Sequence, residues 1–251
     1  VMSGGNGALY AVGLADGRIR LRDENGKVTA EMKMPGRVYA LCALDLDSDG
    51  SDEILAGSDT AGVHAFSATG SPLWTWKGHG TTRTVITEIR PADTTGDAQP
   101  EIVAVGVGWY VLDRQGKMIF KSEMETGGKS WDAVVPERVF TLAVGDLMGD
   151  GKDEIVGDYA GVGDSGGGRI VNVWDGKTQK YLWRHSRPPN RFCGSTLKTV
   201  LVADFDGDGK DEFAIASDAF RLQLGYYNKF GSEQVRIWYC NVGSGANAMV
   251  G

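Results

Sequence analysis

The residues of this chain best suited to chemistry lie in an acidic loop that occurs four times, at positions 45–54, 93–102, 146–155 and 204–213. The copies read DLDSDGSDEI, DTTGDAQPEI, DLMGDGKDEI and DFDGDGKDEF, and they follow one another at intervals of 48, 53 and 58 residues. Each copy has oxygen-bearing side chains at alternate positions and an acid just before an apolar run. One such loop is typical of an acidic turn, but four predict a repeat architecture with a recurring cation site.

The spacing within the loop predicts how an ion would be held. In the fourth copy Asp204, Asp206 and Asp208 stand at positions 1, 3 and 5, from which side chains of a tight loop converge on one point. A glycine at position 6 permits the reversal, because it has no Cβ to disfavour a positive φ. The carbonyl of position 7 then turns inward, and the acid at position 9 completes an all-oxygen site. Such a site suits Ca²⁺ better than a soft metal or Mg²⁺.

The same positions in all four copies are the predicted calcium ligands. They are Asp45, Asp47, Asp49, Ser51 and Glu53 in the first loop; Asp93, Thr95, Asp97 and Glu101 in the second; Asp146, Asp150, Lys152 and Glu154 in the third; and Asp204, Asp206, Asp208, Lys210 and Glu212 in the fourth. The third loop has Met148 at position 3, and the second has Ala98 at position 6 and Pro100 before its acid. We therefore expect up to four Ca²⁺, bound most tightly by the first and fourth loops, then by the third, and least by the second.

The charge distribution also favours metal sites. The four loops contain 17 of the 33 acidic residues, and the formal net charge of the chain is −7. Clustered carboxylates repel one another unless a cation or protons neutralise them, so four Ca²⁺ would bring the chain close to neutral. Solvated acidic β-turns are the alternative interpretation, most of all for a single copy. An EF-hand is excluded, since position 12 is Ala56, Gly157 or Ile215 and each loop leads into a β-rich segment.

Short apolar runs precede and follow each loop, and hairpins with glycine-containing turns come next, which predicts four strands in about 50 residues. This pattern indicates an all-β fold, a β-propeller of four-stranded antiparallel blades forming one domain over residues 1–251. We expect repeats at 8–34 (partial), 37–80, 82–126, 135–186 and 196–240 (partial), and a flexible tail at 241–251. In the last repeat we expect three strands and an insertion, FRLQLGYYNKFG, between the second and the third.

The strand count bears on closure of the ring. The first repeat lacks its first strand and the last lacks a clear fourth, so the two ends do not complement each other. We expect about five blades, either as a segment of a larger propeller, which we favour slightly, or as a five-bladed ring with irregular closure. The oligomeric state is left open.

Composition sets further bounds. With 251 residues, of which 41% are hydrophobic, the chain can bury a core without disulfides. No apolar run is long enough to span a membrane, and no basic patch indicates nucleic acid. Cys42 is expected to be a buried apolar residue, and for Cys193 and Cys240 both a disulfide and two thiols stay open. Extracellular placement is expected because multi-carboxylate sites fill readily where Ca²⁺ is millimolar.

The loops and their flanking apolar runs resemble the FG-GAP (VCBS-like, integrin α-type) propeller family over nearly the whole chain. In that family the D-x-D-x-D-G-x-x-D/E loop joins the first two strands of a blade and binds calcium. The resemblance implies ligands at positions 1, 3, 5 and 9 of the first, second and fourth loops and at positions 1, 5 and 9 of the third, at the residues named above. This chain departs from the pattern in having glutamate at position 9 and in Met148, Ala98 and Pro100. The calcium of the family is usually structural, and its members include adhesion proteins, lectins and polysaccharide lyases.

No catalytic constellation is recognisable, which favours a role without chemistry. His64 and His185 are interpreted as blade-edge residues, and His79 lies in a loop. Most tryptophans are expected to pack within hairpins, while Trp109 with Tyr110, Trp131, and Tyr226 with Tyr227 are weaker candidates for stacking on sugar rings. We expect a secreted or cell-surface, calcium-stabilised propeller that binds a glycan or a protein. The alternatives are a fragment of a propeller-type polysaccharide lyase (rhamnogalacturonan- or ulvan-lyase-like) and a structural or filament subunit.

Overall fold

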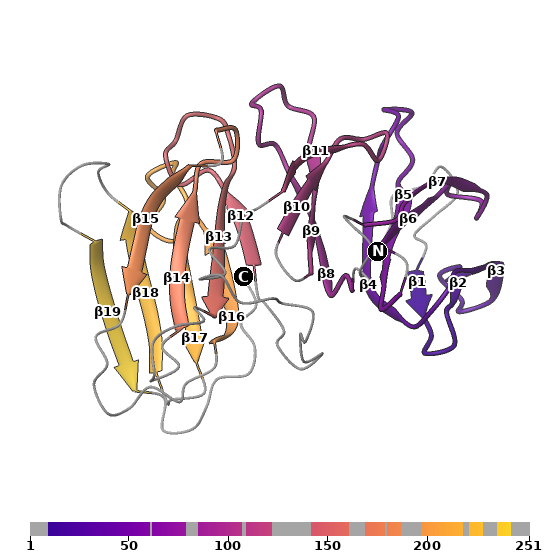
Figure 1. Cartoon of the computed structure of the whole chain (residues 1–251), viewed down its shortest axis with the longest axis horizontal. Coiled ribbons are helices and arrows are strands. Elements are labelled where there is room, and N and C mark those ends of the chain that lie inside the picture. The colour runs from indigo at the N-terminus through magenta and orange to yellow at the C-terminus, as the bar shows by residue number, and fades with distance from the viewer. Residues whose placement is uncertain are drawn as a thin grey trace. The chain divides into compact units, whose positions relative to one another are not determined.

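The computed structural model of the chain describes residues 10–60, 62–78, 85–106, 109–121, 142–160, 169–178, 180–186, 197–217, 221–227 and 235–241. Within them the chain forms β-strands and no helix, and all neighbouring strands of a sheet are antiparallel (Figure 1). This confirms the predicted all-β class. The radial arrangement of the sheets as propeller blades stays a prediction. His79, Trp131, Cys193 and the tail at 242–251 lie outside the described residues.

The strands fall into two compact units. Of the described residues, 10–91 and 101–121 belong to the first unit, and 92–100 and 142–241 to the second. The prediction of a single domain is not tested by this division.

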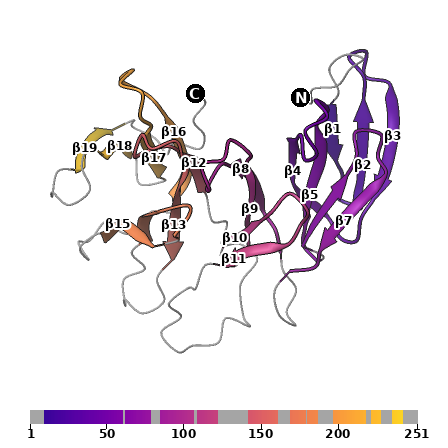
Figure 2. The ribbon, with the colours of Figure 1, turned by 90° about the horizontal axis from the view of Figure 1, so that it is seen from above.

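The first unit holds three sheets, each built from strands that are consecutive in the chain. The three-stranded sheet contains β1 (Tyr10–Gly13), β2 (Arg18–Arg22) and β3 (Val28–Lys33), which Figure 2 shows side by side. The next sheet contains β4 (Val38–Leu44), β5 (Glu53–Ser58), β6 (Val63–Phe66) and β7 (Pro72–Trp76). The third contains β8 (Glu88–Ala92), β9 (Glu101–Val105), β10 (Trp109–Leu112) and β11 (Met118–Lys121).

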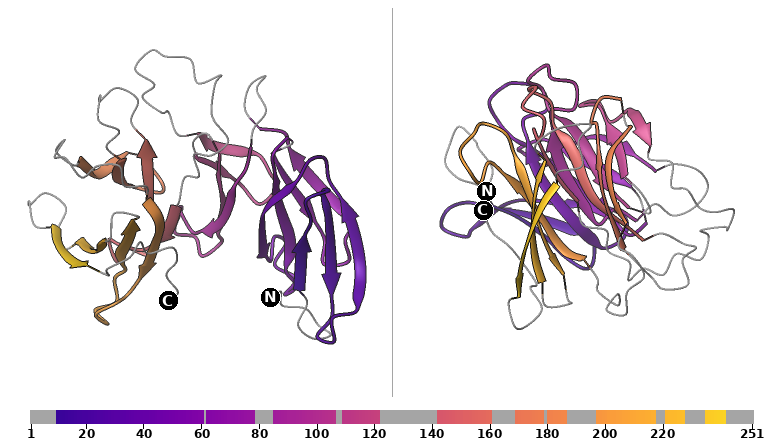
Figure 3. Two further views of the ribbon diagram at one scale, coloured as in Figure 1. Left: turned by 90° about the horizontal axis from the view of Figure 1, so that it is seen from below. Right: turned by 90° about the vertical axis from the view of Figure 1, so that its left-hand side faces the viewer.

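The second unit holds two four-stranded sheets with the same connectivity. Figure 3 shows their strands in the colours from red through orange to yellow. One contains β12 (Leu142–Gly145), β13 (Glu154–Ala160), β14 (Arg169–Trp174) and β15 (Tyr181–Ser186). The other contains β16 (Leu197–Ala203), β17 (Glu212–Ser217), β18 (Arg221–Tyr227) and β19 (Val235–Asn241).

The prediction for the last repeat was wrong in one respect, because its sheet has four strands and not three. The segment interpreted as an insertion is strand β18, and the segment interpreted as the third strand is β19, the fourth. The physical reason is visible in the sequence of β18, RLQLGYY, where Leu222, Leu224 and Tyr226 recur with the period of two that a strand requires.

Local turn chemistry explains the hairpins that join the last two strands of a sheet. In the β10–β11 turn Asp113 Oδ1 accepts N–H bonds from Gln115 (3.0 Å) and Lys117 (2.8 Å), while Gly116 adopts a φ of 78° that suits glycine. The β2–β3 turn repeats this pattern around Asp23, with Gly26 in the left-handed region. The register shifts by a bulge beside both turns, as expected for a hairpin closed by a left-handed glycine.

Apolar layers lie between neighbouring sheets of the first unit. Leu55 and Ala65 pack with Ile102 and Leu112 of the next sheet, and all four are at most 1% exposed. The second strands, β5 and β9, are buried along their full length, which accounts for the consecutive apolar residues that follow the glutamate at the start of each strand. Burying one leucine side chain away from water stabilises the folded state by about 1.5–3 kcal/mol. The acidic loops lie where the first strand of a sheet turns into its second strand.

Candidate metal sites

Each acidic loop connects the first two strands of a four-stranded sheet. The four loops join β4 to β5, β8 to β9, β12 to β13 and β16 to β17. This confirms the predicted placement of the loops at strand–loop–strand corners.

The aspartate at position 1 organises the loop by accepting backbone N–H bonds. Asp204 accepts from the residues at positions 4, 5 and 6, with N···O distances of 2.7, 3.1 and 3.0 Å to Gly207, Asp208 and Gly209. Asp45 and Asp93 accept from the same three positions of their own loops, and Asp146 from positions 5 and 6. The four loops thus share one backbone fold even where their ligand sets differ.

Two positions of each loop, not one, lie in the left-handed region. Position 6 does so as predicted, with φ of 85° at Gly50 and 61° at Ala98. Position 4 does so as well, with φ of 64° at Ser48 and of 77°, 68° and 79° at the glycines of the other three loops. The sequence interpretation missed position 4, although the glycine that three of the four copies carry there was the available signal.

The glutamate at position 9 is buried and points back into its loop. Glu53 accepts the N–H of Leu46 over 2.8 Å, and Glu212 accepts that of Phe205 over 2.9 Å, which is position 2 in both loops. Glu154 instead accepts the N–H of position 3, over 3.0 Å. These bonds turn the carboxylates toward the centre of the loop, where a cation bound by the first aspartates would lie.

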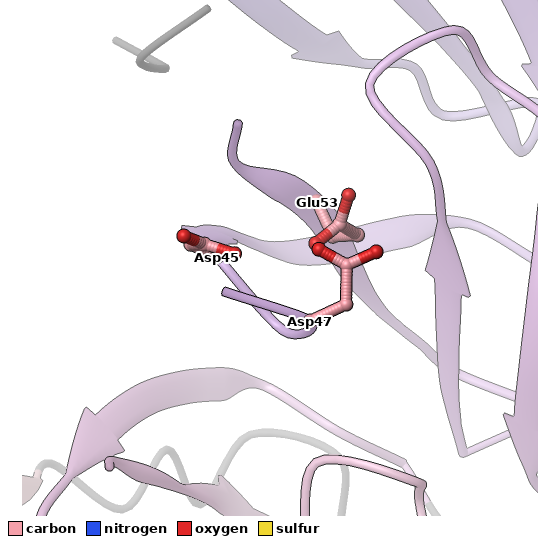
Figure 4. Close-up of side chains that lie close together, drawn as sticks. All are labelled: Asp45, Asp47 and Glu53. Atoms are coloured by element: carbon pink, nitrogen blue, oxygen red, sulfur yellow. The ribbon is translucent and has the colours of Figure 1, made fainter. Parts of the chain in front are cut away.

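In two loops the carboxylates converge as predicted. Asp45, Asp47 and Glu53 in the first loop, and Asp204, Asp206 and Glu212 in the fourth, each place carboxylate oxygens within 4.8 Å of one another. Figure 4 shows Asp47 and Glu53 with their carboxylates adjacent and Asp45 beside them. An all-oxygen donor set of this kind fits Ca²⁺ and could hold a divalent ion.

The position 5 aspartates are not part of these two groups. Asp49 and Asp208 accept the backbone N–H of position 7, over 2.7 Å from Ser51 and 2.9 Å from Lys210. Their carboxylates therefore close the second half of the loop, and a small rotation would be needed for them to reach an ion held by positions 1, 3 and 9. No contact assigns a ligand role to the position 7 carbonyls.

The two middle loops do not gather three carboxylates within the described part of the chain. In the third loop Met148 supplies no oxygen, and the ammonium group of Lys152 lies 2.7 Å from Asp150 Oδ2. In the second loop position 3 is Thr95. The predicted ranking, with the first and fourth loops ahead of the middle two, agrees with this geometry.

The electrostatics of the loops follow from burial and from the crowding of acids. Burial raises the pKa of Glu53 and of Glu212, and the nearby aspartates raise both further. The largest effect is at Glu154, where burial raises the pKa to about 8. Burial also opposes ionisation of Asp45, but N–H donors from Gly50, Ser48 and Asp49 outweigh it and lower the pKa. A divalent ion would relieve the repulsion that the glutamates experience.

Arg114 is a contributor to the first loop that the sequence interpretation missed. From the β10–β11 turn its Nη2 donates to the carbonyl oxygen of Asp45 and, over 3.2 Å, to Ser48 Oγ. The carbonyl of Arg114 in turn accepts the indole N–H of Trp74 over 3.1 Å. The Trp74 ring lies against Gly116, where an added Cβ would come within 2.4 Å of it. No motif marks these residues, because the contacts join segments far apart in the chain.

The remaining candidates lie in structural roles where the structure describes them. His64 Nδ1 is 3.1 Å from Thr75 Oγ1 on the neighbouring strand β7. His64 was interpreted as a blade-edge residue, but its strand, β6, is paired on both sides and so lies inside its sheet. Trp76 and Tyr110 pack with ring centroids 4.8 Å apart and are buried. Trp109 is buried as well, so neither it nor Tyr110 is available to stack on a sugar ring. Nothing is described of the side chains of His185, Tyr226, Tyr227 or Cys240.

Among the described residues we find no helical segment with the length and hydrophobicity needed to cross a bilayer. A scan against models of known protein families finds no match for this chain, and a search of curated proteins finds no significant match either.

Proposed function

We propose that this chain is a calcium-stabilised β-propeller module that acts outside the cell as a binding or adhesion domain for a glycan or a protein and performs no chemistry itself. The observation that carries the proposal is the convergence of carboxylates in the first and fourth loops. The shared backbone fold of all four loops supports it, because the same N–H bonds to position 1 recur in each.

Calcium is the cation that the donor set favours. The residues that would hold it are Asp45, Asp47 and Glu53 in the first loop and Asp204, Asp206 and Glu212 in the fourth, with Asp49 and Asp208 next to them. Their hard oxygen atoms, on a loop that can adjust by rotation of one carboxylate, match the flexible coordination of Ca²⁺ better than the strict octahedron of Mg²⁺.

The expected role of the ion is structural. Each loop joins the first strand of a sheet to its second, so an ion there fixes the corner at which the chain enters the buried strand. The ion also removes the repulsion between acids that burial brings together, which adds to the stability of the folded state. Extracellular Ca²⁺, at millimolar concentration, is sufficient to fill sites of the affinity that such exposed loops provide.

Thermal unfolding in excess EDTA and in excess Ca²⁺ tests the proposal. An ion bound only by the folded state contributes about 2.7 kcal/mol per site at a hundredfold excess over its dissociation constant. We expect a clear rise of the melting temperature with Ca²⁺ and a smaller one with Mg²⁺. Identical unfolding curves in EDTA and Ca²⁺ would refute a structural role for calcium.

Matched variants assign the effect to particular loops. Asp206→Ala removes a converging carboxylate from the fourth loop, whereas Asp97→Ala removes an acid from the second loop, which gathers no such group. We expect Asp206→Ala to lose more of the calcium-dependent stabilisation than Asp97→Ala. A glycan array and a pull-down, both in saturating Ca²⁺, test the binding role, and blank results in both would count against it.

A further inference from the structure

The first sheet of the chain carries a row of arginines on one face. Its middle strand, β2, reads RIRLR, and alternation along a strand places Arg18, Arg20 and Arg22 on one face and Ile19 and Leu21 on the other. Ile19 and Leu21 are at most 1% exposed and pack with apolar residues of the next sheet. The arginines are half-buried, so they lie on the face that is turned away from this core.

Residues of the two neighbouring strands complete this face. They stand directly opposite the arginines, Tyr10 of β1 opposite Arg22, Glu31 of β3 opposite Arg20, and Lys33 of β3 opposite Arg18. We call these six residues the arginine face. Side chains two residues apart on a strand are separated by about 7 Å, so the arginines form a line. Tyr10, which is 44% exposed, lies beside the end of that line.

The positive charge of the arginine face is compensated only in part by acids. Arg18 and Lys33 stand directly opposite each other, and like charges in this arrangement destabilise a sheet. Asp16, in the turn before β2, forms an ion pair with Arg18 over 2.7 Å. Glu31 forms one with Arg20, also over 2.7 Å. Two of the four cations of the face therefore have an acidic partner.

The other two cations, Arg22 and Lys33, form no ion pair within the described residues. Arg22 donates to the carbonyl oxygen of Gly26 over 2.6 Å, and Lys33 donates to that of Asp16, so both acceptors are uncharged. These charges belong to a chain whose formal net charge is −7. An anionic partner would supply the missing compensation.

The repeated fold does not require arginine at these positions. The strands that precede the last strand in the next two sheets are β6 and β10, which read VHAF and WYVL and contain neither arginine nor lysine. Polar residues of either sign would keep an exposed face soluble, whereas three arginines in line repel one another. The row of arginines therefore favours binding of an anion over a purely solvated face.

We propose that the arginine face binds a sulfated polysaccharide. Guanidinium groups bind oxyanions through pairs of parallel N–H bonds. A sulfate has three acceptor oxygens and can accept from two neighbouring arginines, and the polymer repeats this group along its length as the strand repeats its arginines. The ring of Tyr10 offers an apolar surface for a sugar ring. This inference rests on the proposed function, because it names the class of glycan that the binding module takes.

A second copy of the chain is a poorer partner for the same face. Stacked face to face, two copies would place arginines against arginines, which is unfavourable. The arginine face is therefore matched in charge by an anionic polymer and not by itself.

Binding of a heparin oligosaccharide to the intact chain, measured by isothermal titration calorimetry in excess Ca²⁺, tests the proposal. We expect heparin to bind, and to bind more weakly as salt screens the charges. The same oligosaccharide without its sulfates, but with its carboxylates kept, should bind about tenfold more weakly. A single-stranded DNA oligonucleotide of equal charge should also bind more weakly than heparin.

Matched variants assign the binding to the arginine face. Arg22→Gln removes a cation that has no acidic partner, and the dissociation constant for heparin should rise about tenfold. Arg90→Gln makes the same change of net charge on another sheet, where Arg90 lies 2.5 Å from Glu88. This control should change the dissociation constant by less than about twofold.

Two further variants separate binding from stability. Glu31→Gln removes the acid of the arginine face and leaves Arg20 to the ligand, so the dissociation constant should fall about two- to fivefold. Loss of a merely structural contact would not tighten binding. Arg22→Lys keeps the charge without the paired donors and should recover part of the affinity that Arg22→Gln loses. Each variant is titrated at a temperature at which its unfolding curve shows it to be folded.

The outcomes distinguish this inference from the proposed function. The inference is overturned if heparin does not bind, if desulfated heparin or DNA binds equally well, or if Arg22→Gln and Arg90→Gln bind with the same affinity. If heparin does not bind while Ca²⁺ stabilises the chain and a glycan array identifies another ligand, the proposed function stands and only this inference fails. If Ca²⁺ has no effect on unfolding but heparin binds and the variants behave as expected, the calcium part of the proposed function fails and this inference stands.

Discussion

Substitution of the residue at position 6 of the loops tests whether the left-handed backbone conformation at this position affects stability. Ala98 has a φ of 61° at this position, where the other three loops have glycine with φ between 79° and 87°. A residue with a Cβ in the left-handed region costs about 1–2 kcal/mol. Glycine removes this strain, but it also gives the unfolded chain more conformational freedom, which offsets about 0.4–1 kcal/mol.

We therefore expect Ala98→Gly to stabilise the protein by about 0.5–1 kcal/mol. For a chain of this length each kcal/mol changes the melting temperature by about 2–4 °C, so the rise should be about 1–4 °C. Urea unfolding followed by tryptophan fluorescence measures the free energy directly. EDTA should be present throughout, so that differences in Ca²⁺ affinity do not contribute.

The reverse substitution provides the control. Gly209 has a φ of 87° at the same position of the fourth loop, and an added Cβ there would have no atom within 4 Å, so no new packing contact or clash accompanies the backbone strain. Gly209→Ala should destabilise the protein by a similar amount. The reasoning is refuted if Ala98→Gly lowers the free energy of unfolding or if Gly209→Ala leaves it unchanged.

Three further results are expected in EDTA. The free energy of unfolding should fall as the pH rises from about 4.5 to about 8, because burial raises the pKa of Glu154 to about 8 and the folded state keeps a proton that the unfolded state releases. Glu154→Gln should flatten this dependence in urea titrations, and an unchanged slope would contradict the assignment. Arg114→Met removes the donor to the first loop and should cost about 1–3 kcal/mol in the same assay, whereas unaltered stability would show that the contact contributes nothing. Gly116→Ala should destabilise more than Gly26→Ala, since both have a φ of 78° but only the first would place its Cβ against Trp74; equal losses would argue against that packing.

The features that could be predicted from the sequence are those determined by residues close together in the chain. The strand–loop–strand corners and the hairpins follow from apolar runs and turn residues within about ten positions of one another. The converging acids of the first and fourth loops could be predicted for the same reason, since their ligands lie within nine residues. The error in the last repeat came from a strand, β18, whose alternation is short and is interrupted by Gly225.

The contacts that hold the loops in place could not be predicted in this way. Arg114 reaches the carbonyl of a residue 69 positions earlier, and Asp153 and Asp211 reach residues 60 and 65 positions earlier. These bonds use backbone groups of the partner, which leave no signature in its side chains. For the bonds between loops, the repeated aspartate at position 8 is the one sign in the sequence. Its role can be recognised only when the structure of the partner loop is known.

The consecutive order of strands within every sheet has a consequence for biogenesis. A nascent chain emerging from the ribosome has all the pairing partners of a sheet once that sheet's fourth strand has been synthesised, and no later segment must be inserted between strands already formed. The chain segments that must close are short, so the entropic cost of each step is small and assembly is expected to be quick. For the same reason, duplication or deletion of the genetic segment for one sheet changes the number of sheets without rethreading the others.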